Sequence, residues 1–292
     1  MKLPQALLTI PHRRDVPFAR LTTLGLGGVC KFLFEPSSEG EAKCFVKTCR
    51  AHDLSYRILG GGSNLLVLSD IGTPVMRLDI PKELSATPNG VSANASYGHA
   101  ALVNDVANMG LSGVEWAVGI PGSFGGALRM NAGAHGGEWG RVIDRIRFLT
   151  PDGEIVEKIP SQGDFAYRSS FLTDGHIALS ASIKLARRDT ESIKKTMDGF
   201  QTARRQRQPP GRSAGCVFKN PPGKSAGQII DSAGLKGTRV GDAIVSDIHA
   251  NFLLNLGDAT PGQFWELIQI VRSRVFDVHG CELELEVEVW NH

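Results

Sequence analysis

The sequence lacks the features that mark several classes of protein. Its five cysteines are an odd number without paired short spacing, which indicates neither a disulfide framework nor a zinc site. No apolar run approaches the roughly 20 residues that cross a bilayer, and the apolar stretch 6–10 ends at Pro11, too early for a secretion signal. The net charge of +2 is too small to indicate nucleic acid. We therefore expect a cytoplasmic protein with no membrane insertion and no nucleic-acid partner.

The common nucleotide-binding and hydrolase fingerprints are also absent. Gly60 and Gly62 are followed by Leu65 where a dinucleotide turn needs a third glycine, and the chain continues as a strand-like segment. No Gly-x-x-x-x-Gly-Lys-Ser/Thr occurs. The histidines have no metal-ligand spacing, and neither Ser63 nor Ser123 lies in a Gly-x-Ser-x-Gly motif. Neither metal chemistry nor serine hydrolysis is supported.

What the sequence has is glycine, concentrated in two clusters at residues 60–64 and 119–127. Either cluster alone is more often a turn. Glycines, however, let successive main-chain N–H groups converge on one anion, so two clusters together favour one diphosphate. The following stretch, 129–137, is rich in small residues that permit a flat ligand to lie against the main chain. The clusters predict a dinucleotide site of a kind other than the Rossmann type.

Hydrophobic periodicity predicts a chain of mixed helices and strands. Thr260 and Gln263 predict a capping box, and Gly280 the end of the helix that follows. The charged stretch 189–207 and the prolines after it predict a domain boundary near residues 186–212. We expect helices at 39–53, 99–109, 189–207 and 261–279, and strands at 56–59, 65–68, 75–80, 143–149, 154–156, 177–185 and 282–290.

Three residues would have ordinary structural roles if judged alone. Cys216 lies between Gly215 and Val217, where a cysteine is usually a small buried apolar residue. Arg168 would be a surface arginine. Glu286 is one of four glutamates that alternate with apolar residues, and periodicity does not distinguish it from the others.

With these segments together, the chain resembles the UDP-N-acetylenolpyruvoylglucosamine reductase family over nearly its whole length. Any one of the motifs would be weak, but seven in the family's order are highly specific. They are TTLGLGG (22–28), LGGGSNLL (59–66), GIPGSFGG (119–126), YRSSF (167–171), VFKNP (217–221), AGLKG (233–237) and HANF (249–252).

The resemblance implies an α+β fold with a vanillyl-alcohol-oxidase-type FAD-binding domain and a C-terminal α+β substrate-binding domain. The boundaries expected are an N-terminal lead-in at 1–15, the FAD-binding domain at 16–188 with two subdomains split near 75–80, and the substrate-binding domain at 189–292. The short passage after Phe171 is similar to the family's second type, which lacks an inserted loop with a substrate-contacting tyrosine.

The resemblance further implies FAD as cofactor, NADPH as electron donor and UDP-N-acetylglucosamine enolpyruvate as the substrate reduced in peptidoglycan synthesis, by a monomer. A bulky side chain at Gly125 is then expected to abolish flavin uptake by filling space that the main chain needs near the cofactor. The residues implied to bind FAD are Gly60, Gly61, Gly62, Ser63, Asn64, Gly119, Ile120, Pro121, Gly122, Ser123, Gly125, Gly126, Asn131 and Gly133.

By the same resemblance, the catalytic residues are Arg168, Glu286 and Cys216. Arg168 and Glu286 would orient and polarise the substrate carboxylate, and Cys216 occupies the place of a serine that donates a proton. A thiol has an ordinary pKa of about 8.5, so it is a better acid than a hydroxyl. The residues implied to contact the substrate are Tyr167, Lys219 and Asn220.

Two other interpretations remain open from the sequence. A same-fold FAD oxidase would have no use for the segments around Lys219 and His249. A UDP-sugar-binding protein that lost its acid at Cys216 would have no reason to keep Arg168 and Glu286. We expect the reductase.

Overall fold

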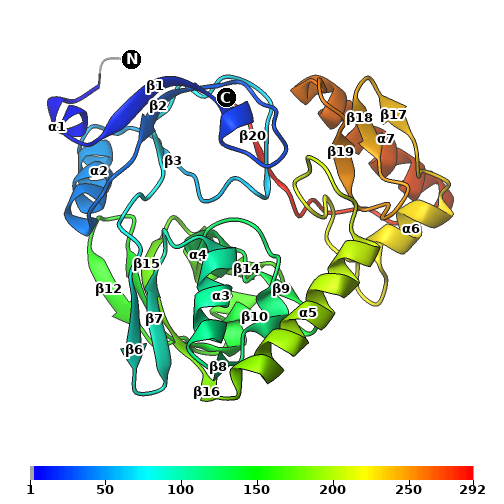
Figure 1. Cartoon of the computed structure of the whole chain (residues 1–292). Helices are drawn as coiled ribbons and strands as arrows, with labels where there is room; N and C mark the ends of the chain where they lie inside the picture. The colour runs from blue at the N-terminus through cyan, green and yellow to red at the C-terminus, as the bar shows by residue number, and fades with distance from the viewer. Residues whose placement is uncertain (1–2, 292) are drawn as a thin grey trace. The chain divides into compact units, whose positions relative to one another are not determined.

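The computed structural model describes residues 3–291. It divides into two compact units, each formed by three stretches of chain (Figure 1). Unit 1 is formed by the described parts of Met1–Arg13, Phe32–Gly61 and Thr73–Ala203, and unit 2 by those of Arg14–Lys31, Gly62–Gly72 and Arg204–His292. The chain therefore passes from one unit to the other within the first glycine cluster, between Gly61 and Gly62.

An antiparallel sheet forms the first layer of unit 1, with strand order β12-β11-β15-β7-β6. The apolar stripes of helices α3 and α4 pack on this sheet around the buried Phe124 and Trp139. The strands and helices are β6 (Leu84–Thr87), β7 (Gly90–Asn94), β11 (Ile143–Leu149), β12 (Ile155–Lys158), β15 (Ile177–Lys184), α3 (His99–Asn108) and α4 (Phe124–Arg129). The predicted strand at 143–149 and the predicted helix at 99–109 are confirmed.

A second core of unit 1 lies under helix α2, whose buried residues include Phe45 and Val46. The predicted helix at 39–53 is thus confirmed, and Ser38 caps it by accepting a hydrogen bond from Glu41 N. Beside it lies a sheet with strand order β1-β2-β5-β3. The elements are α1 (Gln5–Leu8), β1 (His12–Pro17), β2 (Val29–Phe34), α2 (Glu39–Ala51), β3 (Arg57–Ile58) and β5 (Val75–Met76). Of these, β1 from residue 14 onward and β2 up to residue 31 belong to unit 2.

Short hairpins and one long helix complete unit 1. The hairpins β9–β10 and β13–β14 each pair two residues with two. Helix α5 extends past Ala203 into unit 2. The bounds are β8 (Leu111–Ser112), β9 (Gly133–Ala134), β10 (Gly137–Glu138), β13 (Phe165–Ala166), β14 (Ser169–Ser170), β16 (Ala186–Arg187) and α5 (Thr190–Arg207).

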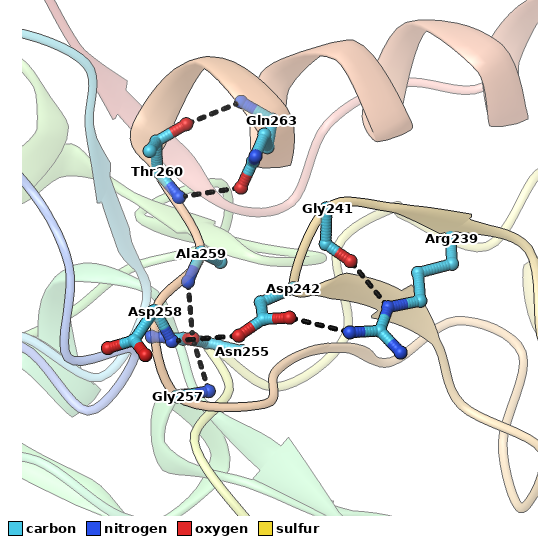
Figure 2. A network of polar contacts seen from close by, with 9 residues as sticks. All are labelled: Arg239, Gly241, Asp242, Asn255, Gly257, Asp258, Ala259, Thr260 and Gln263. Carbon is cyan, nitrogen blue, oxygen red and sulfur yellow. Dashed lines mark hydrogen bonds and ion pairs between the residues drawn. The ribbon is translucent and has the colours of Figure 1, made fainter.

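Unit 2 contains an antiparallel sheet of order β17-β18-β19, with α6 and α7 sharing its core. The predicted capping box of α7 is confirmed, because Thr260 and Gln263 exchange side-chain to main-chain hydrogen bonds (Figure 2). Gly280 ends the helix with φ 59°. The elements are β4 (Leu65–Val67), α6 (Ala226–Ser232), β17 (Arg239–Val240), β18 (Ala243–Val245), β19 (Leu253–Asn255), α7 (Pro261–His279) and β20 (Glu288–Trp290).

Buried Asn255 explains why residues near position 24 belong to unit 2. Its Oδ1 accepts hydrogen bonds from Gly257 N and Ala259 N at the turn shown in Figure 2. Its Nδ2 donates to Leu24 O at 3.0 Å. In addition, β4 pairs in parallel with β20. These long-range bonds add two early stretches to unit 2, which the contiguous division expected from the sequence does not include.

Two local expectations differ from the structure. The strand predicted at 282–290 is wrong over most of its length, since only Glu288–Trp290 pairs as a strand. The segment before it is held by single hydrogen bonds to its neighbours. The alternation of apolar and polar residues does not distinguish such contacts from the pairing of a strand. The lead-in at 1–15 contains α1 and the start of β1, because Leu7 and Ile10 are buried in the core under α2.

Between residues 3 and 291, no helix combines the length and the apolar character needed to cross a membrane. The same residues form no group of three or more His, Cys, Asp or Glu side chains suited to a metal ion.

Candidate active site

The two glycine clusters meet main chain to main chain within unit 1. A Cβ atom on Gly61 would overlap the Cα of Gly122, and one on Gly60 would lie 3.1 Å from Ser123 Oγ. Gly119 and Gly122 have φ values of +75° and +106°, which glycine adopts without strain. At Gly61 and Gly122 no side chain lies between the two loops, which fits a group that binds through main-chain N–H donors.

The second loop is joined to the turn that follows β7. Phe124 N donates to Tyr97 O at 2.9 Å, and Gly125 N donates to Ala95 O at 2.9 Å. A Cβ on Gly125 would lie 2.9 Å from the Cβ of Ala95. A bulky residue at Gly125 would therefore collide with Ala95 in this turn.

The first cluster continues into unit 2 with Gly62, Ser63 and Asn64. Gly62 has φ +65°, and a Cβ there would overlap Leu21 O. Thr23 N donates to Gly62 O at 3.1 Å, while Thr23 Oγ1 donates to Ser213 O at 2.7 Å. The TTLGLGG segment thus ties the glycine loop to the segment that leads to Cys216.

Arg168 lies at the turn of the β13–β14 hairpin with a φ of +56°, a left-handed value that costs energy in an arginine. Its Nη2 donates to Gly133 O at 3.3 Å, and its guanidinium carbon lies 5.0 Å from the ring centre of Tyr167. Tyr167 is exposed. The turn therefore fixes the direction of Arg168 at the expense of local strain, a pattern found at functional positions.

Asn131 holds this hairpin in place. Its side chain is 1% exposed, and its Nδ2 donates to Ala166 O at 2.9 Å, while its Oδ1 accepts from Gly140 N at 2.9 Å. Ser170 Oγ adds a bond to Arg129 O at 2.9 Å. The Asn131 side chain thus positions the β13–β14 hairpin.

In unit 2, Cys216 begins an extended segment that Asn251 holds. Val217 N donates to Asn251 O, Phe218 N donates to Asn251 Oδ1, and Asn251 Nδ2 donates to Phe218 O, at 2.8–2.9 Å. Cys216 itself forms a bridge with Phe252 and is half-buried. Both its main-chain neighbours and its position are therefore fixed by the HANF motif.

Glu286 lies on the other side of this segment. Its N donates to Val217 O at 2.8 Å, and its carbonyl accepts from Asn64 Nδ2 at 2.9 Å. Glu288 N in turn donates to Asn64 O at 3.0 Å. Glu286 is half-buried, whereas Glu284 is exposed. Main-chain bonds also join Glu284 to Lys219 and Glu288 to Asn64, so what sets Glu286 apart is its bond to Val217, the residue after Cys216.

The other predicted substrate contacts take part in local bonds. Lys219 Nζ lies 2.5 Å from Glu284 Oε1, and Asn220 Oδ1 accepts from Ala226 N at the start of α6. Burial lowers the pKa of the Arg204 guanidinium, and negative charge on Cys216 would oppose that shift.

Sequence reasoning quoted the HANF motif but gave Asn251 no role. An asparagine in a motif without secondary-structure periodicity was the available signal for Asn251.

Comparison with known proteins matches two families to different parts of the chain. The FAD binding domain family matches residues 30–158, and the UDP-N-acetylenolpyruvoylglucosamine reductase C-terminal domain family matches residues 206–290. The UDP-N-acetylenolpyruvoylglucosamine reductase of Magnetococcus marinus is 39% identical over 98% of this chain and 94% of that protein. The chain belongs to the UDP-N-acetylenolpyruvoylglucosamine reductase family. The Bacillus subtilis member is 35% identical over 94% of this chain and 92% of its own.

Solved structures agree with this assignment. The family member from Thermus caldophilus superposes with a TM-score of 0.83 and 39% identity over 97% of this chain and 99% of that one. A cholesterol oxidase from B. sterolicum matches 64% of this chain and 39% of its own with a TM-score of 0.50 and 14% identity, which concerns the fold alone. The predicted fold class, family and FAD cofactor are confirmed.

Proposed function

We propose that this protein reduces UDP-N-acetylglucosamine enolpyruvate to UDP-N-acetylmuramate for peptidoglycan synthesis, with FAD as cofactor and NADPH as electron donor. The observation that supports it best is the hydrogen bond that Glu286 N donates to Val217 O, because Val217 directly follows Cys216. In a family of reductases, this bond holds the main chain next to the proposed proton donor, Cys216, close to the main chain of Glu286, which carries the proposed carboxyl group. We further propose that the protein acts as a monomer in the cytoplasm.

Hydride transfer is the chemistry that FAD supplies when bound. The double glycine loop would hold its diphosphate and flank its ring system, through residues 60–64, 119–123, 125, 126, 131 and 133. No side chain stands between the two loops at Gly61 and Gly122, so the backbone donors of both remain close together.

The protein's own residues would hold the enolpyruvyl group and move its proton. Arg168 would bind the substrate carboxylate, with a guanidinium already directed by Gly133 O and Tyr167. Glu286, protonated or sharing a proton, would polarise the same carboxylate as charge develops. Cys216 would donate the proton that the carbon next to the carboxylate requires after hydride addition.

Lys219, Asn220 and Tyr167 would contact the UDP portion of the substrate. Lys219 would exchange its exposed partner Glu284 for a phosphate, because an ion pair with a solvated glutamate is weak. Asn220 and Tyr167 would add hydrogen bonds to the nucleotide portion.

Absorbance spectroscopy of the two half-reactions tests this proposal. The purified protein should be yellow, NADPH should bleach it, and the enolpyruvyl substrate should then restore the colour with formation of UDP-N-acetylmuramate. A flavin that is bleached by NADPH and reoxidised by oxygen but not by the enolpyruvyl substrate would indicate an oxidase. A yellow protein that neither compound changes would indicate a binding protein.

A further inference from the structure

His99, the first residue of α3, is completely buried and hydrogen-bonded at both ring nitrogens. Its Nδ1 lies 2.9 Å from Ile120 O, and its Nε2 lies 3.1 Å from Trp139 Nε1. Its main-chain N also donates to Gly122 O at 3.0 Å. One residue therefore makes two contacts with the second glycine loop.

The two partners of the His99 ring determine its tautomer. The Ile120 carbonyl can only accept a hydrogen bond, so Nδ1 must hold a proton. The Trp139 indole N–H can only donate, so Nε2 must be unprotonated. His99 is thus a neutral imidazole that donates to the loop and accepts from the tryptophan.

The glycine loop needs such a contact because its own residues do not fix its shape. Gly119 and Gly122 adopt positive φ values on either side of Ile120 and Pro121, and glycine permits many other conformations at little cost. The hydrogen bonds from His99 reach the carbonyls of Ile120 and Gly122, so those peptide groups cannot rotate without breaking them.

Trp139 holds the far side of the imidazole in a rigid aromatic cluster. Its ring centre lies 4.9 Å from that of Phe124 and 5.4 Å from those of Trp116 and His99. Trp139 is 0% exposed. Because the indole cannot turn in this packing, its N–H keeps the His99 ring in the orientation that directs Nδ1 at the loop.

We propose that His99 is a positioning residue for the cofactor, which holds residues 120–122 in the conformation that binds FAD and is itself oriented by Trp139. This inference rests on the proposed function in one respect, namely that the second glycine loop contacts FAD. No motif or family feature described above assigns a role to His99 or Trp139.

A pair of substitutions separates positioning from packing. In His99→Asn the amide nitrogen can take the place of Nδ1 and keep the donor to Ile120 O, whereas His99→Gln extends to the place of Nε2 and loses that donor. We expect FAD titration of the flavin-depleted protein to give a dissociation constant raised about tenfold in His99→Gln, the scale of one lost buried hydrogen bond. In His99→Asn it should stay within about threefold of wild type. Equal weakening in both variants, or none in either, would overturn the proposal.

The tautomer supplies a second test that needs neither FAD nor activity. The ¹⁵N spectrum of the His99 imidazole in the flavin-depleted full chain should show a proton on Nδ1, and Trp139→Phe should broaden or shift that signal while retaining the aromatic packing. An Nε2 proton in wild type would overturn the proposal even if no His99 variant folds. A wild-type protein that shows the Nδ1 proton but takes up no FAD would contradict the proposed function instead.

Discussion

The glycine loops of unit 1 and the Cys216 segment of unit 2 are held by opposite means. The loops at Gly61 and Gly122 approach so closely that no side chain fits between them. The segment at Cys216 is held instead by the side-chain amides of Asn251 and Asn64, which bond to the main chain of Phe218 and Glu286. The close approach in the first region requires the absence of side-chain atoms, and the second region requires the presence of particular hydrogen-bonding side chains.

This difference indicates how each region should respond to change. A region defined by close backbone approach tolerates no added atom, even a methyl group, since the atoms it meets belong to the main chain. A region held by amide side chains tolerates added bulk better than the loss of one donor or acceptor, because the buried partner is left unsatisfied.

The largest effect is expected at Gly61. Its replacement by alanine would push a Cβ into the Cα of Gly122, so the two loops must separate and FAD binding should be abolished. The matched control is Gly72→Ala, because a Cβ there meets nothing within 4 Å. Flavin absorbance of the purified variants measures the outcome, and a Gly61→Ala protein as yellow as wild type would contradict the close-approach argument.

Glu286 should show the next largest effect. Glu286→Gln should slow reoxidation of the reduced flavin by the enolpyruvyl substrate by about 100-fold or more, the usual scale for loss of a proton-handling group. Reduction by NADPH should change little. Glu284→Gln is the control, because Glu284 is 72% exposed and pairs with Lys219 at the surface. Stopped-flow absorbance measures both steps, and equal slowing in the two variants would show that the wrong glutamate was chosen.

Cys216→Ala should also affect only the second half-reaction, with product formation reduced about 100-fold because the proton donor is lost. Cys216→Ser should recover much of the rate, since a hydroxyl can donate in the same place. Wild type should in addition lose activity at high pH as the thiol ionises, and the serine variant should not. Near-normal turnover in Cys216→Ala would mean that this thiol only packs.

Asn251→Ala tests the amide contacts of unit 2 through stability. It leaves the buried N–H and carbonyl of Phe218 without their partner, at a cost of about 3 kcal/mol in the free energy of unfolding. Gln228→Ala, at an exposed position of α6, should cost less than about 0.5 kcal/mol. Urea denaturation measures the free energy of unfolding of the two variants. Similar midpoints would contradict the proposed difference between the Cys216 segment and the glycine loops of unit 1.

The smallest expected effect concerns His249 of the same motif. Burial lowers the pKa of its imidazole, and the charge of Lys236 lowers it further. The unfolded chain therefore binds a proton near pH 6.5 that the folded protein does not. Stability should be complete above that pH and decrease as pH falls from about 6.5 towards the lower folded pKa. Thermal unfolding of wild type and His249→Gln between pH 5 and 8 should show a weaker decrease in the variant; parallel curves would contradict this.

Much of the fold was predictable because local chemistry dictates it. The helix after Thr260 begins and ends where its cap residues and Gly280 require, and the helix at 39–53 follows its apolar stripe. The strand predicted at 282–290 is wrong over most of its length, because apolar and polar residues also alternate in a segment whose main chain bonds to several neighbours in turn. Glu286 is an example, since its main chain bonds to Val217 and to Asn64.

The sequence by itself determined the family, the two glycine loops and the candidate residues Arg168, Cys216 and Glu286, because motif order and glycine content are local and specific. Only the tertiary structure decided which contacts hold them. Asn64 meets Glu286 across 222 positions, and His99 meets Ile120 across 21. Hydrogen bonds between distant residues depend on where folding brings each donor and acceptor, and no periodicity along the chain encodes that pairing.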